Sequence, residues 1–365
     1  MAGLDGLPTP ALLLDLDRLE RNLRTMAERA AALGVRLRPH AKTHKCAEVA
    51  RRQLELGARG LTVATLEEAR SFSAAGFEDL TWALPVPFSR IDEARHLAER
   101  VDLGLLVDSM EAVDRLESTG FPFLVWLKID CGYHRAGVDP ALPEAESLAR
   151  RLAEHPLLRF QGLLTHSGQA YAAADRAELA AVAEHERATL VDAAARWRAR
   201  GVRVPDVSVG STPAMSAVRD LSGVDEARPG NYVFYDRMQV SLGSCSPADC
   251  AVSVLASVVS SPAGAGHSVV DAGALALSKD PGHPVDRERG SLGDLWADHA
   301  AGVFDPDLRL VALSQEHGVL SGRRSVGDRV RILPHHSCLT VACFDRYHVV
   351  RGDEVVAEWP IDRAR

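Results

Sequence analysis

The sequence predicts an α/β fold: a (β/α)8 barrel of the TIM type followed by a C-terminal antiparallel β domain. From residue 35 to about residue 234, short apolar runs alternate with longer segments of helical periodicity. This alternation is typical of parallel strands joined by helices, and eight such strands close a barrel. After about residue 240 the sequence changes to short apolar runs separated by Gly, Pro and Asp turns, which is typical of antiparallel strands. An open doubly wound sheet is the alternative, but no G-x-G-x-x-G follows the first strand.

The first half of the chain supplies the candidate strands of the barrel in order. Several of the helical segments between them end at a glycine, such as Gly57, Gly76 and Gly201, as helix C-termini often do. We expect helices over residues 46–56, 66–75, 89–100 and 174–200. The eight expected strands are residues 35–42, 60–65, 79–86, 101–108, 121–130, 159–166, 206–211 and 226–234.

The second half is β-rich, with one helical pattern over residues 291–301. We therefore expect a barrel domain over residues 1–240 and a β domain over residues 241–365, with residues 1–14 open to either domain. The expected β-rich stretches are residues 251–261, 266–278, 308–320, 328–344 and 347–360.

The composition excludes several classes of protein. A chain of 365 residues with 46% hydrophobic and 25% charged residues is ordinary for a globular protein with a large core. A net charge of −8 and the lack of a basic run argue against nucleic acid as a partner. The N-terminus shows no signal peptide and no membrane span. The six cysteines form no C-x-x-C pair, so we expect reduced thiols in a cytoplasmic protein.

Polar clusters follow most of the predicted barrel strands, where the chemistry of such barrels lies. The segment LRPHAKTHKCAE, residues 37–48, places two histidines and two lysines after the first strand. Other clusters follow the fifth strand (residues 130–135), the sixth (165–171) and the seventh (210–213). We therefore expect the catalytic side chains of the protein to lie at this end of the barrel.

Two of the clusters suggest a phosphate site. Ser211 and Thr212 offer hydroxyl and backbone N–H groups at the start of a helix, although such residues often serve only as helix caps. In the segment RPGNY, Gly230 allows close approach of the backbone, and Tyr232 offers a hydroxyl. Barrels frequently bind phosphate with the loops after the seventh and eighth strands.

A lysine opposite a phosphate site suggests pyridoxal 5′-phosphate (PLP) held as a Schiff base. We assign the Schiff base to Lys42, and we expect Lys45 to lie in the following helix as a charge partner. His166 is expected against the ring of the cofactor, with Arg135 approaching the ring or a neighbouring loop. The alternative role for both residues is a structural hydrogen bond.

The β domain contains a candidate metal site. His336 and Cys338 are two residues apart, and on a strand this spacing puts both side chains on one face. Imidazole and thiolate together suit Zn²⁺, with the remaining coordination positions open to water and substrate. We expect a divalent metal here, with zinc favoured over manganese or magnesium.

Eight segments of the chain give it a family resemblance. The chain resembles the D-threonine aldolase/D-serine dehydratase family, which are alanine-racemase-like, fold-type III PLP enzymes. The resemblance implies that Lys42 binds PLP and that His336 and Cys338 bind the metal. It implies that the phosphate is held by residues 210–212 and 230–232, among them Asn231. It also implies that Tyr171 lies near the substrate. It also implies a homodimer. The segments are RPHAKTHK, DCGYHRAG, THSGQAY, VSVGSTP, RPGNYVFYD, DAGALALSKD, SQEHGVL and PHHSCLT.

The resemblance favours a lyase of D-β-hydroxy amino acids, either a dehydratase or an aldolase. In this family a His-x-Cys pair is typical of dehydratases, so Cys338 favours conversion of D-serine or 3-hydroxy-D-aspartate to a 2-oxo acid and ammonia. The alternative is a D-threonine or 3-hydroxy-D-aspartate aldolase, which yields glycine and an aldehyde. Gln169 departs from the family pattern, which has a histidine there in several members. More remote alternatives are a metal-independent racemase and a non-catalytic PLP-binding protein, which would lack the β domain.

Overall fold

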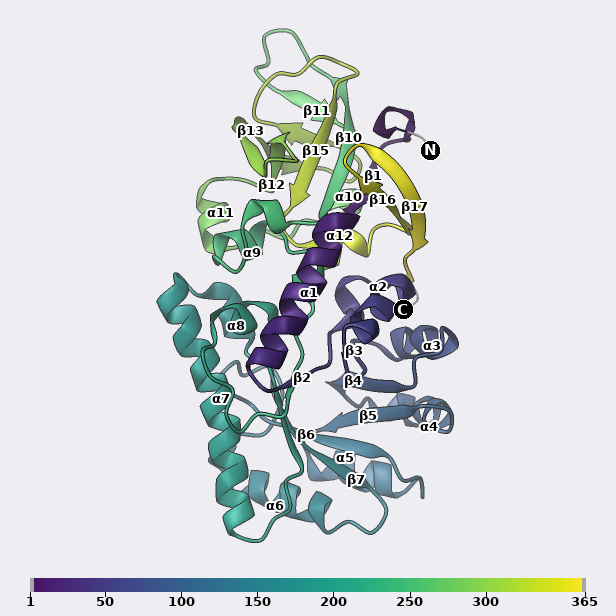
Figure 1. Cartoon of the computed structure of the whole chain (residues 1–365), viewed down its shortest axis with the longest axis vertical. Coiled ribbons are helices and arrows are strands. Elements are labelled where there is room, and N and C mark those ends of the chain that lie inside the picture. Colours follow the sequence, from purple (N-terminus) through teal and green to yellow (C-terminus); the bar gives the residue numbers. More distant parts are fainter. Residues whose placement is uncertain (1–2, 363–365) are drawn as a thin grey trace. The chain divides into compact units, whose positions relative to one another are not determined.

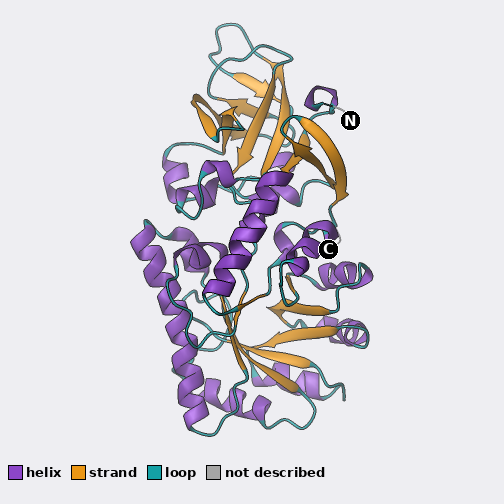
Figure 2. Ribbon diagram, viewed as in Figure 1, coloured by secondary structure: helices purple, strands orange, loops and turns teal. Residues whose placement is uncertain are grey.

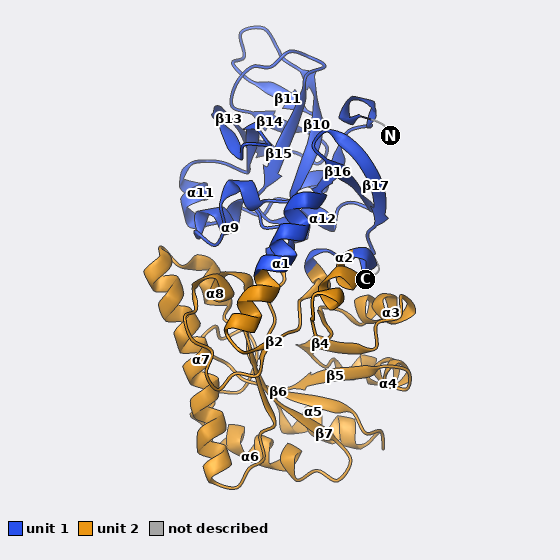
Figure 3. Cartoon of the chain, in the orientation of Figure 1, with its two compact units in different colours: residues 1–25, 43–48, 231–363 blue, residues 26–42, 49–230, 364–365 orange. Residues whose placement is uncertain are grey.

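The computed structural model describes residues 3–362. The chain divides into two compact units (Figure 3). Among the described residues, the barrel unit comprises residues 26–42 and 49–230, and the β unit comprises residues 3–25, 43–48 and 231–362. The sequence predicts a boundary at residue 240, with residues 43–48 in the barrel domain. In the structure, the barrel unit ends at residue 230, and residues 43–48 belong to the β unit.

The barrel unit contains an eight-stranded parallel sheet in the order β2-β9-β8-β7-β6-β5-β4-β3. A bridge between His40 and Thr62 joins the two edge strands, so the sheet closes. Leu106, Trp126 and Leu164, from three consecutive strands, form one buried apolar cluster, as expected for parallel strands covered by helices. The strands are β2 (Arg36–Leu37), β3 (Leu61–Val63), β4 (Asp79–Pro85), β5 (Asp102–Val107), β6 (Leu124–Lys128), β7 (Arg159–Leu164), β8 (Asp206–Val209) and β9 (Glu226–Ala227).

Helices alternate with these strands along the chain (Figures 1 and 2). Side-chain caps begin several of them: Thr65 accepts from the backbone N–H of Glu68, and Ser211 accepts from that of Ala214. Three-residue 3₁₀ turns lie at Ala41–Thr43 and Phe88–Arg90, and a five-residue turn lies at Gly168–Ala172. The helices are α1 (Leu16–Ala32), α2 (Ala47–Glu55), α3 (Leu66–Ala74), α4 (Ile91–Ala98), α5 (Met110–Glu117), α6 (Pro143–Ala153), α7 (Arg176–Ala199) and α8 (Thr212–Ala217), of which α1 and α2 extend across the division between the units.

The β unit is built on a nine-stranded, mainly antiparallel sheet in the order β11-β14-β13-β12-β15-β10-β1-β16-β17. Its β1 comes from the N-terminus and pairs antiparallel with β10 and parallel with β16, which places this segment in the β unit. The strands are β1 (Ala11–Asp15), β10 (Val252–Ser260), β11 (Ser268–Val270), β12 (Gly293–Asp298), β13 (Val303–Leu313), β14 (Gly318–Leu320), β15 (Arg329–Pro334), β16 (Arg346–Arg351) and β17 (Glu354–Pro360). Four short helices accompany them: α9 (Arg237–Ser241), α10 (Ala274–Leu277), α11 (Pro284–Glu288) and α12 (Ser337–Val341).

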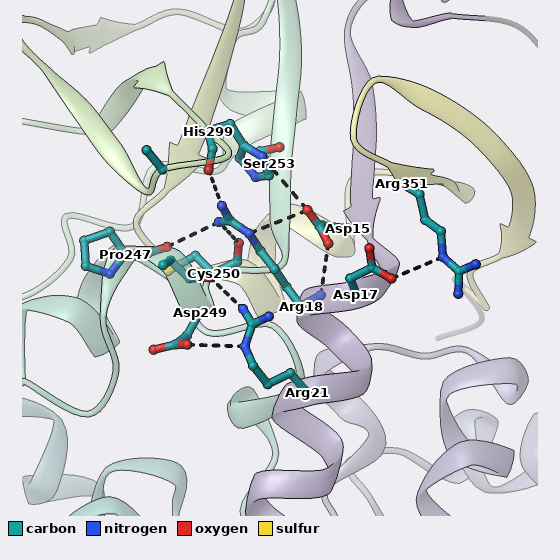
Figure 4. Close-up of polar contacts among 12 residues, drawn as sticks. Asp15, Asp17, Arg18, Arg21, Pro247, Asp249, Cys250, Ser253, His299 and Arg351 are labelled. Atoms are coloured by element: carbon teal, nitrogen blue, oxygen red, sulfur yellow. Dashed lines mark hydrogen bonds and ion pairs between the residues drawn. The ribbon is translucent and has the colours of Figure 1, made fainter.

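Arg18 anchors the start of α1 within the β unit (Figure 4). Its backbone N–H donates to Asp15 Oδ1 at 3.0 Å, and its guanidinium donates to the carbonyl of Cys250 at 3.0 Å and to that of His299. The Arg18 guanidinium also lies 5.6 Å from the centre of the Trp296 ring. A buried arginine with these partners fixes the connection between β1 and α1.

The observed barrel and antiparallel β unit confirm the predicted fold class. The helix expected over residues 291–301 is wrong, because this segment forms β12 and pairs with β13 and β15. Across residues 3–362, no helix has the length and apolar character needed to span a bilayer.

Candidate active site

Lys42 lies in the 3₁₀ turn that follows the first barrel strand. Its side chain is exposed, whereas its neighbours Ala41 and Thr43 are buried, so the turn presents Lys42 outward from a fixed backbone. Lys45 is not in a helix as predicted. It adopts a left-handed conformation with φ of 47°, which is not a helical conformation, and α2 begins only at Ala47.

Two histidines lie close to Lys42 in the barrel unit. Burial lowers the pKa of His40 well below its ordinary value, and the positive charges of Lys42, His166 and Arg228 lower it further. Burial and the same cationic surroundings, beginning with Lys42, also lower the pKa of His166 well below its ordinary value. Both imidazoles are therefore neutral at physiological pH, so each ring has one nitrogen that accepts and one that donates. Their lowered pKa values also make both rings poor proton acceptors, so near Lys42 they serve as neutral hydrogen-bonding groups.

The structure adds Lys128, Arg228 and Glu186 to this region, and none of the three was assigned a role from the sequence. Burial lowers the pKa of Lys128 to about 8, with a contribution from the charge of Arg228. Arg228 is buried and donates to Ser208 Oγ and to the carbonyl of Thr165. Burial raises the pKa of Glu186, whose carboxylate accepts from the backbone N–H of Ser167 at 3.0 Å. A lysine that ends the apolar strand LVWLK was the one sequence feature that could have drawn attention to this cluster.

Aromatic and cationic side chains line the same part of the barrel. The His166 ring lies 6.3 Å, centre to centre, from the Tyr171 ring and 6.4 Å from the Tyr133 ring. Arg135 is exposed, and its guanidinium lies 5.2 Å from the Tyr133 ring. Gln169 donates from Nε2 to the carbonyl of Cys131 at 3.1 Å. This bond is structural, and the Gln169 amide cannot act as a base as a histidine at this position could.

The residues expected to hold phosphate are all buried. Ser211 caps α8, so this residue has the alternative role named above, that of a helix cap. Ser211, Thr212 and Gly230 belong to the barrel unit, whereas Asn231 and Tyr232 begin the second half of the β unit.

His336 and Cys338 flank Ser337 at the start of α12 in the β unit. The strand geometry predicted for this pair is wrong, because β15 ends at Pro334 and Cys338 lies in the first turn of a short helix. His336 Nδ1 lies 2.8 Å from Asp280 Oδ2. Burial opposes a charge on His336, but Cys338 and then Asp280 hold its pKa well above the ordinary value. The imidazole is thus oriented by a carboxylate and lies next to a sulfur atom.

The donor set fits a divalent metal of the zinc type. A histidine whose second nitrogen is held by a carboxylate is the usual arrangement around such an ion, and a thiolate is a favoured zinc ligand. Within residues 3–362, no group of three or more His, Cys, Asp or Glu side chains is arranged to hold a metal. A metal bound here would therefore have His336 and Cys338 as its protein ligands and keep positions open to water and substrate.

A buried carboxylate organises the turn that contains these two residues. Asp236 Oδ2 accepts from the backbone N–H of Ser337 at 2.9 Å and from Asn231 Nδ2 at 2.6 Å, and Asp236 Oδ1 caps α9. Arg237 forms ion pairs with Asp286 at 3.0 Å and Asp294 at 2.6 Å. These ion pairs make it a structural residue of the β unit.

Comparison with known proteins identifies the family of this chain. The alanine racemase N-terminal domain matches residues 14–238, and the putative serine dehydratase domain matches residues 251–350. The chain belongs to the D-threonine aldolase/D-serine dehydratase family. This confirms the resemblance found in the sequence, and the two matched domains follow one another as the barrel and the β sheet do.

Relatives in this family match the chain over nearly its whole length. D-threo-3-hydroxyaspartate dehydratase of Delftia sp. (strain HT23) is 40% identical, with 97% of each chain covered. D-serine dehydratase of Dictyostelium discoideum is 36% identical, covering 97% of this chain and 96% of that one. A solved structure of D-threo-3-hydroxyaspartate dehydratase, a cysteine-to-alanine mutant in the metal-free form, has a TM-score of 0.93, with 38% identity and 100% of both chains covered. D-threonine aldolase of Arthrobacter sp. is also related, at 30% identity over 97% of this chain and 92% of that one.

Proposed function

We propose that this protein is a PLP- and divalent-metal-dependent lyase that dehydrates D-β-hydroxy amino acids. The substrate class is 3-hydroxy-D-aspartate or D-serine, and the products are a 2-oxo acid and ammonia. The observation that carries the proposal is the pairing of His336, oriented by Asp280, with Cys338 at the start of α12. The full-length similarity to two dehydratases supports the same activity.

The residues around Lys42 fit PLP. An exposed lysine amine beside two neutral imidazoles can form and break a bond to a carbonyl carbon. When bound, PLP would act as the electron sink at the α-carbon of the substrate, and the metal would act as a Lewis acid toward the β-hydroxyl. We propose that Lys42 binds the cofactor, that His166 lies against it with Arg135 nearby, and that Ser211, Thr212, Gly230, Asn231 and Tyr232 hold its phosphate.

Proton transfer is the task of the chain's own side chains. The α-proton must leave the substrate, and the departing hydroxyl must be accompanied by a proton. Lys42 is the candidate for the first transfer, because its exposed amine follows the first barrel strand, where PLP would be held. Tyr171 and His166, whose rings lie 6.3 Å apart, are the candidates for the second.

Two solved structures of D-threo-3-hydroxyaspartate dehydratase support the metal assignment. Their titles name a histidine-to-alanine mutant and a cysteine-to-alanine mutant two positions apart, the spacing of His336 and Cys338 here. We propose zinc as the metal, with manganese or magnesium as alternatives, because zinc suits an imidazole–thiolate pair. A homodimer, as in alanine racemases, and a cytoplasmic location complete the proposal, and the free cysteines of the described residues are compatible with that location.

A panel of D- and L-β-hydroxy amino acids tests the proposed reaction. Each substrate is incubated with the enzyme, and 2-oxo acid, ammonia, glycine and aldehyde are quantified separately. We expect 2-oxo acid and ammonia in equal amounts from the D-isomers alone. Glycine and an aldehyde as the main products would replace the proposed dehydratase with the related aldolase activity.

A further inference from the structure

Thr43 lies next to Lys42 in the chain and contacts Cys338, one of the proposed metal ligands. It follows Lys42 directly in the chain, and its Oγ1 lies 3.2 Å from Cys338 Sγ. Thr43 is 1% exposed, so water does not compete for its hydroxyl. A thiolate that binds a metal has no proton to give, and the hydroxyl must then be the donor.

The backbone after Lys42 is held at two further points within the β unit. The hydroxyl of Tyr347 donates to the carbonyl of His44 at 2.7 Å, and the backbone N–H of Asp362 donates to the carbonyl of Lys45 at 2.8 Å. Tyr347 is fully buried, and burial raises the pKa of its phenol well above the ordinary value, so it stays a donor. Residues 43–45 therefore have little freedom to shift unless their partners shift with them.

We propose that Thr43 is a positioning residue that couples metal binding at Cys338 to the placement of Lys42. The hydrogen bond from Thr43 to the sulfur lowers the electron density that the thiolate gives to the metal, as an outer-shell donor does. The bond also fixes the residue next to Lys42 when the metal is in place. This inference rests on the proposed metal and PLP sites and adds a residue to them.

The coupling must act in both directions, because linkage between two binding sites is reciprocal. If bound metal fixes Thr43 and so favours the position of Lys42 that binds PLP, then bound PLP strengthens metal binding by the same factor. We expect this factor to be about fivefold or more in the native protein. Loss of the Thr43 hydroxyl should bring the factor toward one, whereas a purely structural defect would weaken both ligands without changing it.

Cobalt(II) provides a direct view of the sulfur. In the full-length protein loaded with cobalt(II), a sulfur-to-metal charge-transfer band reports on hydrogen bonds to Cys338. Thr43→Val should move this band to lower energy, because the thiolate then gives more electron density to the metal. It should also weaken cobalt(II) binding about 10-fold, because the sulfur loses the contact that positions it. Thr43→Ser keeps the hydroxyl and should keep the native band. Thr340→Val is the matched control, since Thr340 is also buried in the β unit but donates to the carbonyl of Leu277 at 3.0 Å.

The coupling factor is measured on the same proteins, as the ratio of the cobalt(II) dissociation constants without and with PLP. The proposal expects a reduced ratio in Thr43→Val and a native ratio in Thr43→Ser and Thr340→Val. A native band and a native ratio in Thr43→Val would overturn the role of Thr43 alone. The native protein should give a charge-transfer band that is absent from Cys338→Ser. If it does not, the metal assignment fails, and the inference fails with it.

Discussion

The hydrogen bond between Asp280 and His336 allows a quantitative prediction about metal affinity. The bond is 2.8 Å long, and the side chains of His336 and Asp280 are 26% and 19% exposed. Asp280 is itself fixed, because its other carboxylate oxygen accepts from the backbone N–H of Gly282 at 2.9 Å. Asp280→Asn keeps an acceptor for His336 Nδ1 but removes the negative charge that makes the bond strong.

The expected loss of zinc affinity is about 10-fold, or roughly 1.4 kcal/mol. Replacement of such outer-shell partners costs about 10- to 100-fold in general, and the partial exposure of this pair places it at the lower end. The assay is a zinc titration against a competing chelator. Asp305→Asn is the control, because Asp305 is paired with Arg324 at 2.7 Å in the same unit and should not affect zinc. Unchanged zinc affinity in Asp280→Asn, or an equal loss in the control, would refute the assignment.

Three further predictions follow from the site. Lys42→Ala should abolish the visible absorbance of enzyme-bound PLP after dialysis, whereas Lys45→Ala should keep it; the reverse pattern would transfer the role to Lys45. Cys338→Ala should lose turnover but retain PLP, as judged by that absorbance, and normal turnover would reject Cys338 as a ligand. The folded-state pKa of Lys128 is about 8, below the ordinary value of 10.5, so the unfolded chain binds the extra proton between these values and stability rises with pH there. Between about pH 7 and pH 9.5, Lys128→Met should lack about 2 kcal/mol of this rise in the free energy of unfolding. The measurement is urea denaturation of the native protein and the variant at each pH. Parallel curves of unfolding free energy against pH would contradict the shifted pKa.

The barrel could be predicted because its determinants are local. Apolar runs such as residues 103–107 favour a strand buried on both faces, and helix caps such as Thr65 lie next to the helices they begin. The helix expected over residues 291–301 failed for a related reason. This short segment gains its structure from pairing with β13 and β15, and periodicity within it says nothing about those partners.

The placement of Ala11–Asp15 shows the same limit at long range. Its apolar run is compatible with either unit, and only its pairing with Val252–Ser260, far along the chain, decides that it belongs to the β sheet. The residues of the candidate site could be identified from the sequence where they lie in clusters after predicted strands. Asp280, Asp236 and Thr43 lie in the segments quoted above, but their roles could not be predicted, because each acts through a partner that is distant in the sequence.

The most direct test of the account is the release of 2-oxo acid from 3-hydroxy-D-aspartate and D-serine before and after metal removal. The native enzyme is assayed as isolated, after treatment with a chelator, and after readdition of zinc, with PLP kept saturating throughout. The account predicts that 2-oxo acid formation disappears with the metal and returns with zinc, and that Cys338→Ala does not recover. Undiminished 2-oxo acid formation by the fully metal-free enzyme would contradict it.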